Sequence, residues 1–171
     1  ASTGNLGHVI IPPDELTKIR KKEAETAGSL AGIEVIGGMF DDLDIFDNNK
    51  AARDKMVEVI KYAQPDFIIT HNPDDYMPDH TAVSRLVFDA SFTATLPNYK
   101  CGGEKAAKLV PIYYMDTLAG VNFNPTEFVD ISGEIDLKIK MLECHESQLV
   151  WMREHDGIDF ADMVRTCSRY R

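Results

Sequence analysis

The sequence predicts an α/β fold with a mainly parallel, Rossmann-like sheet and helices on both of its faces. Short segments rich in apolar and β-branched residues are typical of strands and occur at 33–40, 66–71, 109–115 and 127–131. They alternate with segments in which apolar residues recur at helical spacing, at about 14–31, 48–63, from 79 onward, and at about 133–154. This alternation of strands and helices indicates the α/β class.

The first helix, at about 14–31, follows two prolines, which suit a helix start because the missing N–H groups cost little there. Its apolar face consists of residues at helical spacing, namely Leu16, Ile19, Ala24, Ala27 and Leu30. Arg20 and Glu23 fall inside this apolar stripe. Two opposite charges there indicate either a structural ion pair or a functional site, and periodicity leaves both interpretations open.

Next along the chain, residues 33–40 predict a buried strand that runs into an acidic loop, which contains Asp41, Asp42, Asp44 and Asp47. The helix at 48–63 precedes residues 66–71, which have the composition of a central parallel strand. A polar loop at 72–78 leads into the helix that begins at Asp79. The acidic loop is either solvated or a site for a cation or sugar hydroxyls.

A segment rich in Gly and Lys, 98–108, separates this half from the strands at 109–115 and 127–131. On the last long helix, Lys138, His145 and Gln148 lie on one flank beside the apolar stripe. Such a flank is either a surface edge or the far wall of a cleft.

Length, charge and cysteine content narrow the range of possible functions. A chain of 171 residues fits a single domain, here 1–171. Its net charge of −10 offers no basic stripe for nucleic acid, and no apolar run approaches the roughly 20 residues of a membrane span. Three cysteines without framework spacing indicate free thiols in a reducing compartment, so we expect a cytoplasmic protein.

Ligands of parallel sheets bind beyond the carboxyl ends of the strands, so we expect the functional residues in the loops at 2–8, 40–48 and 71–80. The last of these holds two His and three Asp within ten residues. His80 in the first turn of a helix is a candidate metal ligand, with Asp79 as a hydrogen-bond partner of an imidazole. The alternative is a capped helix start in which Asp79 bonds backbone N–H groups.

Three motifs together resemble the LmbE/PIG-L family of N-acetylglucosaminyl deacetylases. The early signature combines Thr3-x-x-x-Gly7-His8, Ile19-Arg20-x-x-Glu23-x-x-x-Ala27 and Phe40-Asp41-Asp42. The second is the run from Pro65 to His80, with Thr70-His71-Asn72-Pro73-x-Asp75-Tyr76-x-Pro78-Asp79-His80. The third is Lys138-x-x-Met141-Leu142-x-x-His145-x-Ser147-Gln148.

The resemblance implies a Rossmann-like fold and a metal-dependent amide hydrolase that acts on an N-acetylated sugar, with zinc or another divalent metal as cofactor. The metal ligands in the family are a His and an Asp of an N-terminal P-H-P-D-D motif and the His that corresponds to His80. An Asp of that motif acts as general base, and a protonated His stabilises the oxyanion. Arg20, Asp42 and His145 are the substrate-binding residues that the resemblance implies. Family members often form homo-oligomers.

Two departures from the family pattern stand out. The P-H-P-D-D motif and the strand and helix that carry it are absent, so we expect a single LmbE-like domain truncated at the N-terminus and at the C-terminus. Met77 occupies the position where the family has His, and a thioether cannot donate a proton. We therefore assign Asp79 and His71 as the catalytic candidates of this chain, with His71 as the nearest replacement for the missing His.

Three functions remain open. The first is deacetylation of an N-acetylglucosamine-type sugar or glycoconjugate. The second is a catalytically impaired family member that binds a sugar or related small molecule without hydrolysis. The third is a nucleotide-binding module that uses the turn at 3–7, which ranks last because the sequence has neither a G-x-G-x-x-G motif nor a P-loop.

Overall fold

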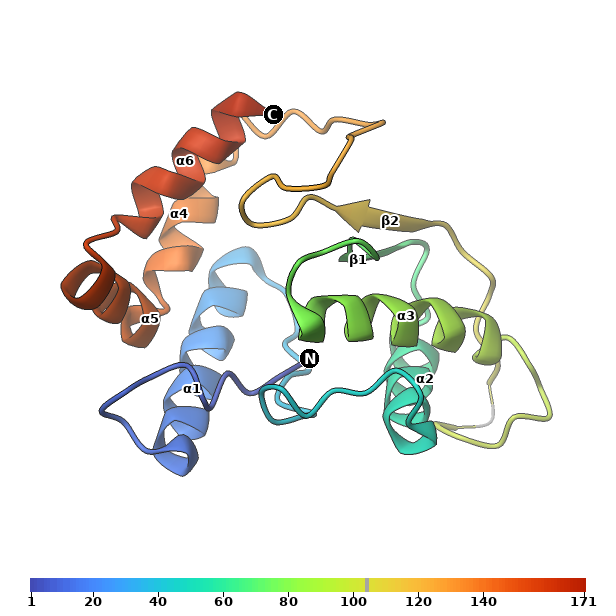
Figure 1. The fold of residues 1–171 in the computed structure, drawn as a ribbon. Coiled ribbons are helices and arrows are strands. Elements are labelled where there is room, and N and C mark those ends of the chain that lie inside the picture. The colour runs from blue at the N-terminus through green and yellow to red at the C-terminus, as the bar shows by residue number, and fades with distance from the viewer. Residues whose placement is uncertain (104) are drawn as a thin grey trace. The chain divides into compact units, whose positions relative to one another are not determined.

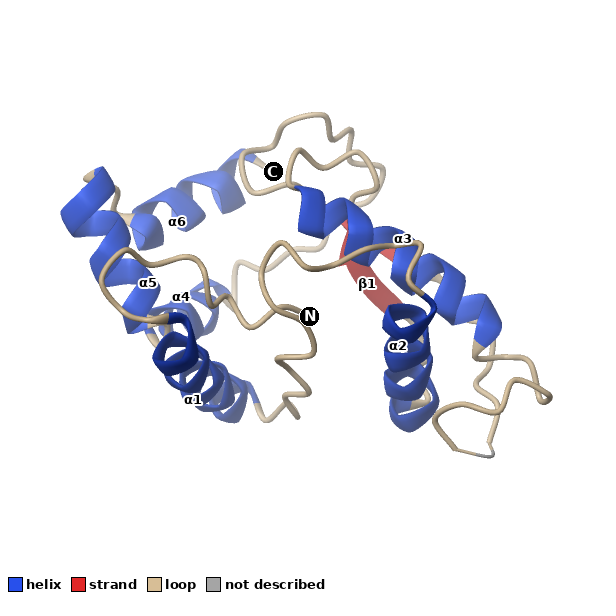
Figure 2. Ribbon diagram, turned by 60° about the horizontal axis from the view of Figure 1, so that its bottom comes forward, coloured by secondary structure: helices blue, strands red, loops and turns tan. Residues whose placement is uncertain are grey.

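The structure is a computed structural model that describes residues 1–103 and 105–171 (Figure 1). In chain order the elements are α1 (Pro13–Ala31), α2 (Lys50–Ala63), β1 (Ile68–His71), α3 (Pro78–Thr93), β2 (Ile112–Met115), α4 (Ile135–Glu143), α5 (Glu146–Trp151), the π-helix η1 (Met152–Asp156) and α6 (Phe160–Tyr170). Helices make up most of the regular structure, as the colouring of Figure 2 shows. None of the helices in the described ranges combines the length and apolar character that crossing a bilayer requires.

The chain divides into two compact units. Unit 1 comprises Ala1–Asp42 and Pro125–Arg171, and unit 2 comprises Leu43–Asn124. Unit 1 therefore contains α1 and the C-terminal helices, and unit 2 contains both strands with α2 and α3.

Unit 2 is built on a two-stranded parallel sheet. Ile68 of β1 pairs with Ile112 of β2, and the register continues to the pair of His71 and Met115. Helix α3 packs on β1, and α2 packs on α3. The apolar core of these helices includes Met56, Val57, Ile60, Val83 and Leu86. The register places His71 at the carboxyl end of β1, where parallel sheets bind ligands.

Local signals explain how the helices of unit 2 begin. The side chain of Asn49 accepts hydrogen bonds from the backbone N–H groups of Ala51 and Ala52, which caps α2. Helix α3 begins at Pro78, whose missing N–H is tolerated in the first turn. This start fixes the turn between β1 and α3, and with it the direction in which the side chains of that turn project.

In unit 1, α1 packs against α4 and α5, and α6 packs on α4. Leu16 and Ile139 are the large apolar side chains at the centre of this packing and are almost fully buried. The N-terminal segment joins the same unit through a parallel bridge between Ser2 and Phe40. The backbone N–H of Thr3 donates to the carbonyl of Phe40 over 2.8 Å, which holds the loop at 2–8 beside the acidic segment at 41–42.

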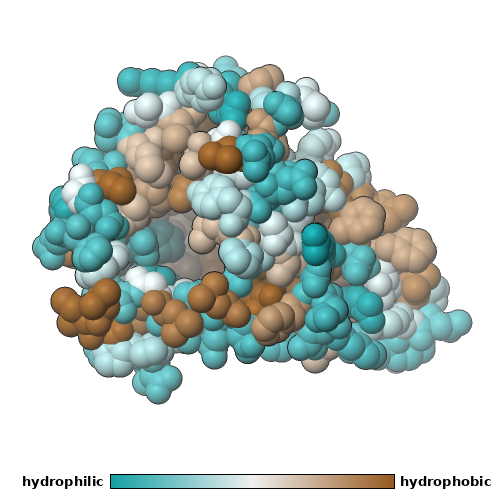
Figure 3. Space-filling view, in the orientation of Figure 1, coloured by the Kyte–Doolittle hydropathy of each residue, from teal (hydrophilic) through white to brown (hydrophobic). Residues whose placement is uncertain are grey.

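The sheet is smaller than the sequence predicts. Residues 33–40 and 127–131, all of which the structure describes, form no strand apart from the bridge at Phe40. The prediction that 33–40 is a buried strand is wrong here, because Ile33 is 55% exposed and Ile36 is 43% exposed. Figure 3 shows apolar residues on the surface that faces the viewer, many of them in a band along its lower left.

The predicted long helix at 133–154 is interrupted. Helix α4 ends at Glu143, and α5 begins at Glu146. Between them His145 has φ −89° and ψ 57°, outside the helical region. A π-helical segment, η1, then continues from α5 as far as Asp156. The interruption places His145 at the N-terminus of a new helix, where its position depends on what holds α5.

Candidate functional site

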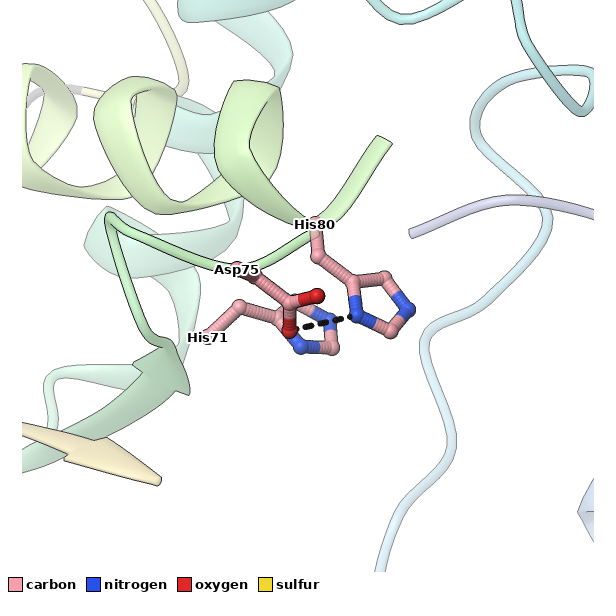
Figure 4. A group of neighbouring side chains, drawn as sticks. All are labelled: His71, Asp75 and His80. Atoms are coloured by element: carbon pink, nitrogen blue, oxygen red, sulfur yellow. Dashed lines mark hydrogen bonds and ion pairs between the residues drawn. The ribbon is translucent and has the colours of Figure 1, made fainter. Parts of the chain in front are cut away.

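Unit 2 contains a cluster of three side chains of the types that bind metal ions, at the carboxyl end of β1 (Figure 4). His71 is the last residue of β1, Asp75 lies in the loop that follows, and His80 lies in the first turn of α3. One ligand atom from each residue lies within 4.8 Å of the others. Among the residues that the structure describes, this is the only group of three or more His, Cys, Asp or Glu that meets this criterion.

Asp75 holds His80 in place. Oδ2 of Asp75 lies 2.9 Å from Nδ1 of His80, and Oδ1 accepts a hydrogen bond of 2.9 Å from the backbone N–H of Met77. The carboxylate is almost fully buried, with a side-chain exposure of 2%. Because Nδ1 is engaged by the carboxylate, Nε2 is the ring nitrogen of His80 that is left for a metal.

Charges within the cluster favour metal binding. Burial alone would raise the pKa of Asp75, but the hydrogen bonds from Met77 and His80 outweigh it and leave the pKa below its ordinary value. Burial, followed by the neighbouring His80, lowers the pKa of His71 to about 4, although Asp75 acts in the opposite direction. A neutral His71 beside an ionised Asp75 is the protonation state that a divalent cation requires.

The rings of His71 and His80 lie face to face, with centroids 3.9 Å apart and planes inclined by 10°. The lone pair of each ring nitrogen lies in the plane of its ring, so one of the two rings has to turn out of the stack before both can bind one ion. Imidazole nitrogens are ligands that Zn2+ takes in catalytic sites, where a carboxylate often bonds the second nitrogen of a ligand His. The cluster therefore fits zinc: His71 and His80 would hold it, and Asp75 would orient the His80 ring.

Asp79 lies apart from this cluster although it is the neighbour of His80 in sequence. Its Oδ2 accepts a hydrogen bond of 2.9 Å from the backbone N–H of Leu43. The carboxylate that contacts the imidazole is that of Asp75, for which the sequence alone indicates no separate role. The signal for Asp75 is its place within the second motif, five residues before His80 in the turn that Pro78 closes.

The other candidate residues lie in unit 1, where Arg20 makes three hydrogen bonds. It donates to the carbonyls of Gly4 and Gly7, the latter over 3.2 Å, and to Oε1 of Gln148. Burial lowers the pKa of Arg20, while the charges of Asp42 and Glu23 oppose this effect. The carboxylate of Glu23 accepts hydrogen bonds from the backbone N–H and the hydroxyl of Ser147, and not from Arg20. The two charges of the apolar stripe therefore act on different partners.

Asp42 links the acidic segment to the N-terminal loop. Its carboxylate accepts hydrogen bonds from the Ser2 hydroxyl and, over 3.1 Å, from the backbone N–H of Leu6. Its own backbone N–H donates to Oδ1 of Asn5 over 3.0 Å. In this structure Asp42 shapes the loop at 2–6, and its contact with a sugar stays a prediction.

A cavity of about 610 Å³ lies within unit 1, a volume typical of small-molecule sites. Hydrogen-bonding side chains on its wall include Ser2, Thr3, Arg20, Glu23, His145 and Gln148. Of the three predicted substrate-binding residues, Arg20 and His145 line this cavity and Asp42 does not. The cavity wall offers both hydrogen-bond donors and hydrogen-bond acceptors, which suits a polyhydroxylated ligand.

Comparisons with known proteins agree with the motifs. The chain is 28% identical over 141 residues to 4-oxalmesaconate hydratase of Pseudomonas putida, an alignment that covers 78% of this chain and 54% of that protein. It is 28% identical over 150 residues to diacetylchitobiose deacetylase of Thermococcus kodakarensis, with coverage of 80% and 53%. The chain thus spans about half the length of the curated relatives it matches.

A solved structure shares the fold. The N,N'-diacetylchitobiose deacetylase of Pyrococcus horikoshii, crystallised with an inhibitor, superposes with a TM-score of 0.71 at 22% identity, over 91% of this chain and 61% of that one. The family model described as PIG-L, GlcNAc-PI de-N-acetylase, matches residues 1–91. The chain belongs to the PIG-L (LmbE-like) family.

Proposed function

We propose that the protein is a zinc-dependent hydrolase that removes the N-acetyl group from an N-acetylglucosamine-type sugar or glycoconjugate. The observation that carries this proposal is the cluster of His71, Asp75 and His80 at the carboxyl end of β1. Zinc, when bound, supplies Lewis acidity toward an amide carbonyl and toward water. The family to which the chain belongs includes enzymes of this class.

Within the cluster, each side chain has a distinct task. Asp75 fixes the orientation of the His80 ring through the bond to Nδ1, so that Nε2 projects away from the carboxylate. His71 packs flat against His80 and is neutral at neutral pH, so it serves as a ligand or as a proton acceptor near the cluster. The backbone N–H of Met77 holds Asp75 in place.

The cavity of unit 1 supports a sugar as the substrate. Sugar hydroxyls need partners that donate and accept hydrogen bonds, and Thr3, His145 and Gln148 on its wall provide both. The relative from Thermococcus kodakarensis is a diacetylchitobiose deacetylase, so the substrate of that protein is an N-acetylated sugar.

Amine release from N-acetylglucosamine, measured with the full-length zinc-loaded protein, tests the proposal. We expect turnover that disappears on chelation and returns with zinc. The His80→Ala variant should fold, as judged by circular dichroism, but lose both zinc and turnover. Zinc stoichiometry that is unchanged in His80→Ala would contradict the assignment of the cluster.

A second candidate is the addition of water to a carbon–carbon double bond. It is favoured by the similarity to 4-oxalmesaconate hydratase and by Met77, whose thioether cannot donate the proton that an amine leaving group needs. Loss of ultraviolet absorbance from an unsaturated dicarboxylate, without amine release from N-acetylglucosamine, would support the hydratase. If calorimetry shows that zinc and sugar bind but neither reaction proceeds, the protein is a sugar-binding member without catalysis.

A further inference from the structure

We propose that Glu23 is a positioning residue of the sugar pocket, which acts through Ser147 to hold the first turn of α5 and thereby His145 and Gln148. The inference rests on the proposed function only in that it names the ligand of the cavity as a sugar. Its structural part, that Glu23 fixes His145, is independent of the reaction.

The contact between Glu23 and Ser147 takes the place of a helix cap. Oε1 of Glu23 accepts a hydrogen bond of 2.7 Å from the backbone N–H of Ser147, and Oε2 accepts one of 2.8 Å from the Ser147 hydroxyl. Helix α5 begins at Glu146, and the side chain of its N-cap residue, His145, makes no capping hydrogen bond. A carboxylate from α1 therefore satisfies a backbone donor that a helix N-terminus otherwise leaves open.

Arg20 adds a second connection on the same face of α1. It lies three residues before Glu23, so the two side chains project from adjacent turns of the helix. Its guanidinium donates to Oε1 of Gln148, the residue that follows Ser147, and to the carbonyls of Gly4 and Gly7. One face of α1 thus holds the start of α5 and the loop at 2–8, which both contribute to the cavity.

His145 depends on this arrangement because no continuous helix supports it. Its backbone N–H donates to Leu142 of α4 over 2.9 Å, and its carbonyl accepts from Gln148 and Leu149 of α5, both over 3.1 Å. The residue is the hinge between the two helices, with ψ 57°. If the first turn of α5 shifts, His145 moves on the cavity wall while α4 and the rest of unit 1 keep their packing.

The test is a double-mutant cycle in the full-length zinc-loaded protein, with Glu23→Ala, Ser147→Ala and the double variant. Glu15→Ala is the control, because Glu15 is an exposed glutamate on the same helix that does not line the cavity. We expect the KM for N-acetylglucosamine to rise roughly threefold to tenfold in Glu23→Ala, the range that loss of one helix cap corresponds to, with a smaller change in kcat. The double variant should be no worse than Glu23→Ala, because both changes remove one contact.

Glu23→Gln should restore most of the affinity. An amide at this position accepts from the backbone N–H of Ser147 with its oxygen and donates to the hydroxyl with its nitrogen. Effects of Glu23→Ala and Ser147→Ala that add in full would overturn the proposal, because a glutamate in direct contact with the sugar acts without Ser147. A lower melting temperature with unchanged KM would also overturn it and leave Glu23 as a stabilising residue only.

The imidazole signals of His145, observed by NMR and assigned with His145→Asn, give a readout that needs no activity. They should shift in Glu23→Ala and in Ser147→Ala but not in Glu15→Ala. Signals that stay in place would refute the positioning role even if the enzyme is a deacetylase. Signals that shift in a protein that neither binds nor hydrolyses the sugar would leave the positioning role intact and refute the proposed function.

Discussion

Nδ1 of His80 lies 2.9 Å from Oδ2 of Asp75, five residues earlier in the chain. The same carboxylate accepts a hydrogen bond from the backbone N–H of Met77, so Asp75 links the turn after β1 to the first turn of α3. A carboxylate that orients a metal-binding imidazole increases its basicity and fixes its tautomer. The relationship makes Asp75 the residue on which metal affinity in this protein should depend most after the histidines.

Asp75→Asn should weaken zinc binding by about tenfold to a hundredfold, the usual effect of losing a carboxylate beside a metal-binding His. Asp79→Asn is the matched control, because the Asp79 carboxylate accepts from the Leu43 backbone and, among the described residues, does not contact the His80 ring, and an amide oxygen keeps the bond to Leu43. Competition with a chromophoric chelator measures both affinities. Equal losses in the two variants would return the role of partner to Asp79.

The choice between these two aspartates shows where sequence reasoning ends. Asp79 is adjacent to His80 in the sequence, but successive residues of a helix project about 100° apart, so adjacency does not bring the side chains together. Asp75 reaches His80 only because the turn that ends at Pro78 folds back on α3. The position of His80 at the start of a helix and the metal-binding chemistry of the segment follow from the sequence. The identity of the partner follows from the path of the turn.

The secondary structure also contains elements that local sequence signals predict and elements that depend on contacts with other segments. The sequence predicts the first helix at about 14–31, and α1 spans Pro13–Ala31, because its prolines and its apolar periodicity are local signals. Residues 33–40 have the composition of a strand, but a strand forms only where a neighbouring strand supplies hydrogen bonds, and here the pairing is limited to the bridge with Ser2. The sequence does not predict the break at His145, because the apolar spacing continues across it.

Gly102→Ala should destabilise unit 2. Gly102 has φ +68°, and a Cβ at this position would lie 2.4 Å from Cα of Glu58 on α2. Neither backbone can yield easily, so overpacking of about 1–3 kcal/mol adds to the cost of a left-handed residue with a side chain. Gly103→Ala is the control, since Gly103 has φ +100° but no atom within 4 Å of the added Cβ. Urea denaturation should show the larger loss for Gly102→Ala, and equal losses would show that the contact with Glu58 is irrelevant.

Cys101 should react slowly with alkylating reagents. Burial, together with the charges of Asp54 and Glu58, raises the pKa of its thiol, and Sγ donates to the Asp54 carbonyl over 3.3 Å. Only the thiolate reacts, so the curve of alkylation rate against pH should lie at higher pH than that of N-acetylcysteine. Glu58→Gln removes one negative charge and should move the curve back toward lower pH. Mass spectrometry of the peptide that contains Cys101 measures the rate, and a curve that coincides with that of the free thiol would refute the shift.

Met77→His should increase the rate of deacetylation. Met77 precedes α3, and its backbone N–H is held by Asp75, so a histidine at this position would start from a fixed backbone next to the metal-binding cluster. The imidazole would provide a proton donor that the thioether lacks, and general acid catalysis contributes about 10²–10⁴-fold to a rate. We expect the natural protein to be a slow deacetylase of N-acetylglucosamine and the variant to be faster mainly in kcat.

The comparison should use full-length proteins with equal zinc content, and Met77→Leu as a control that replaces the thioether without adding a donor. Fast turnover by the natural protein, with no gain in Met77→His, would show that another group donates the proton.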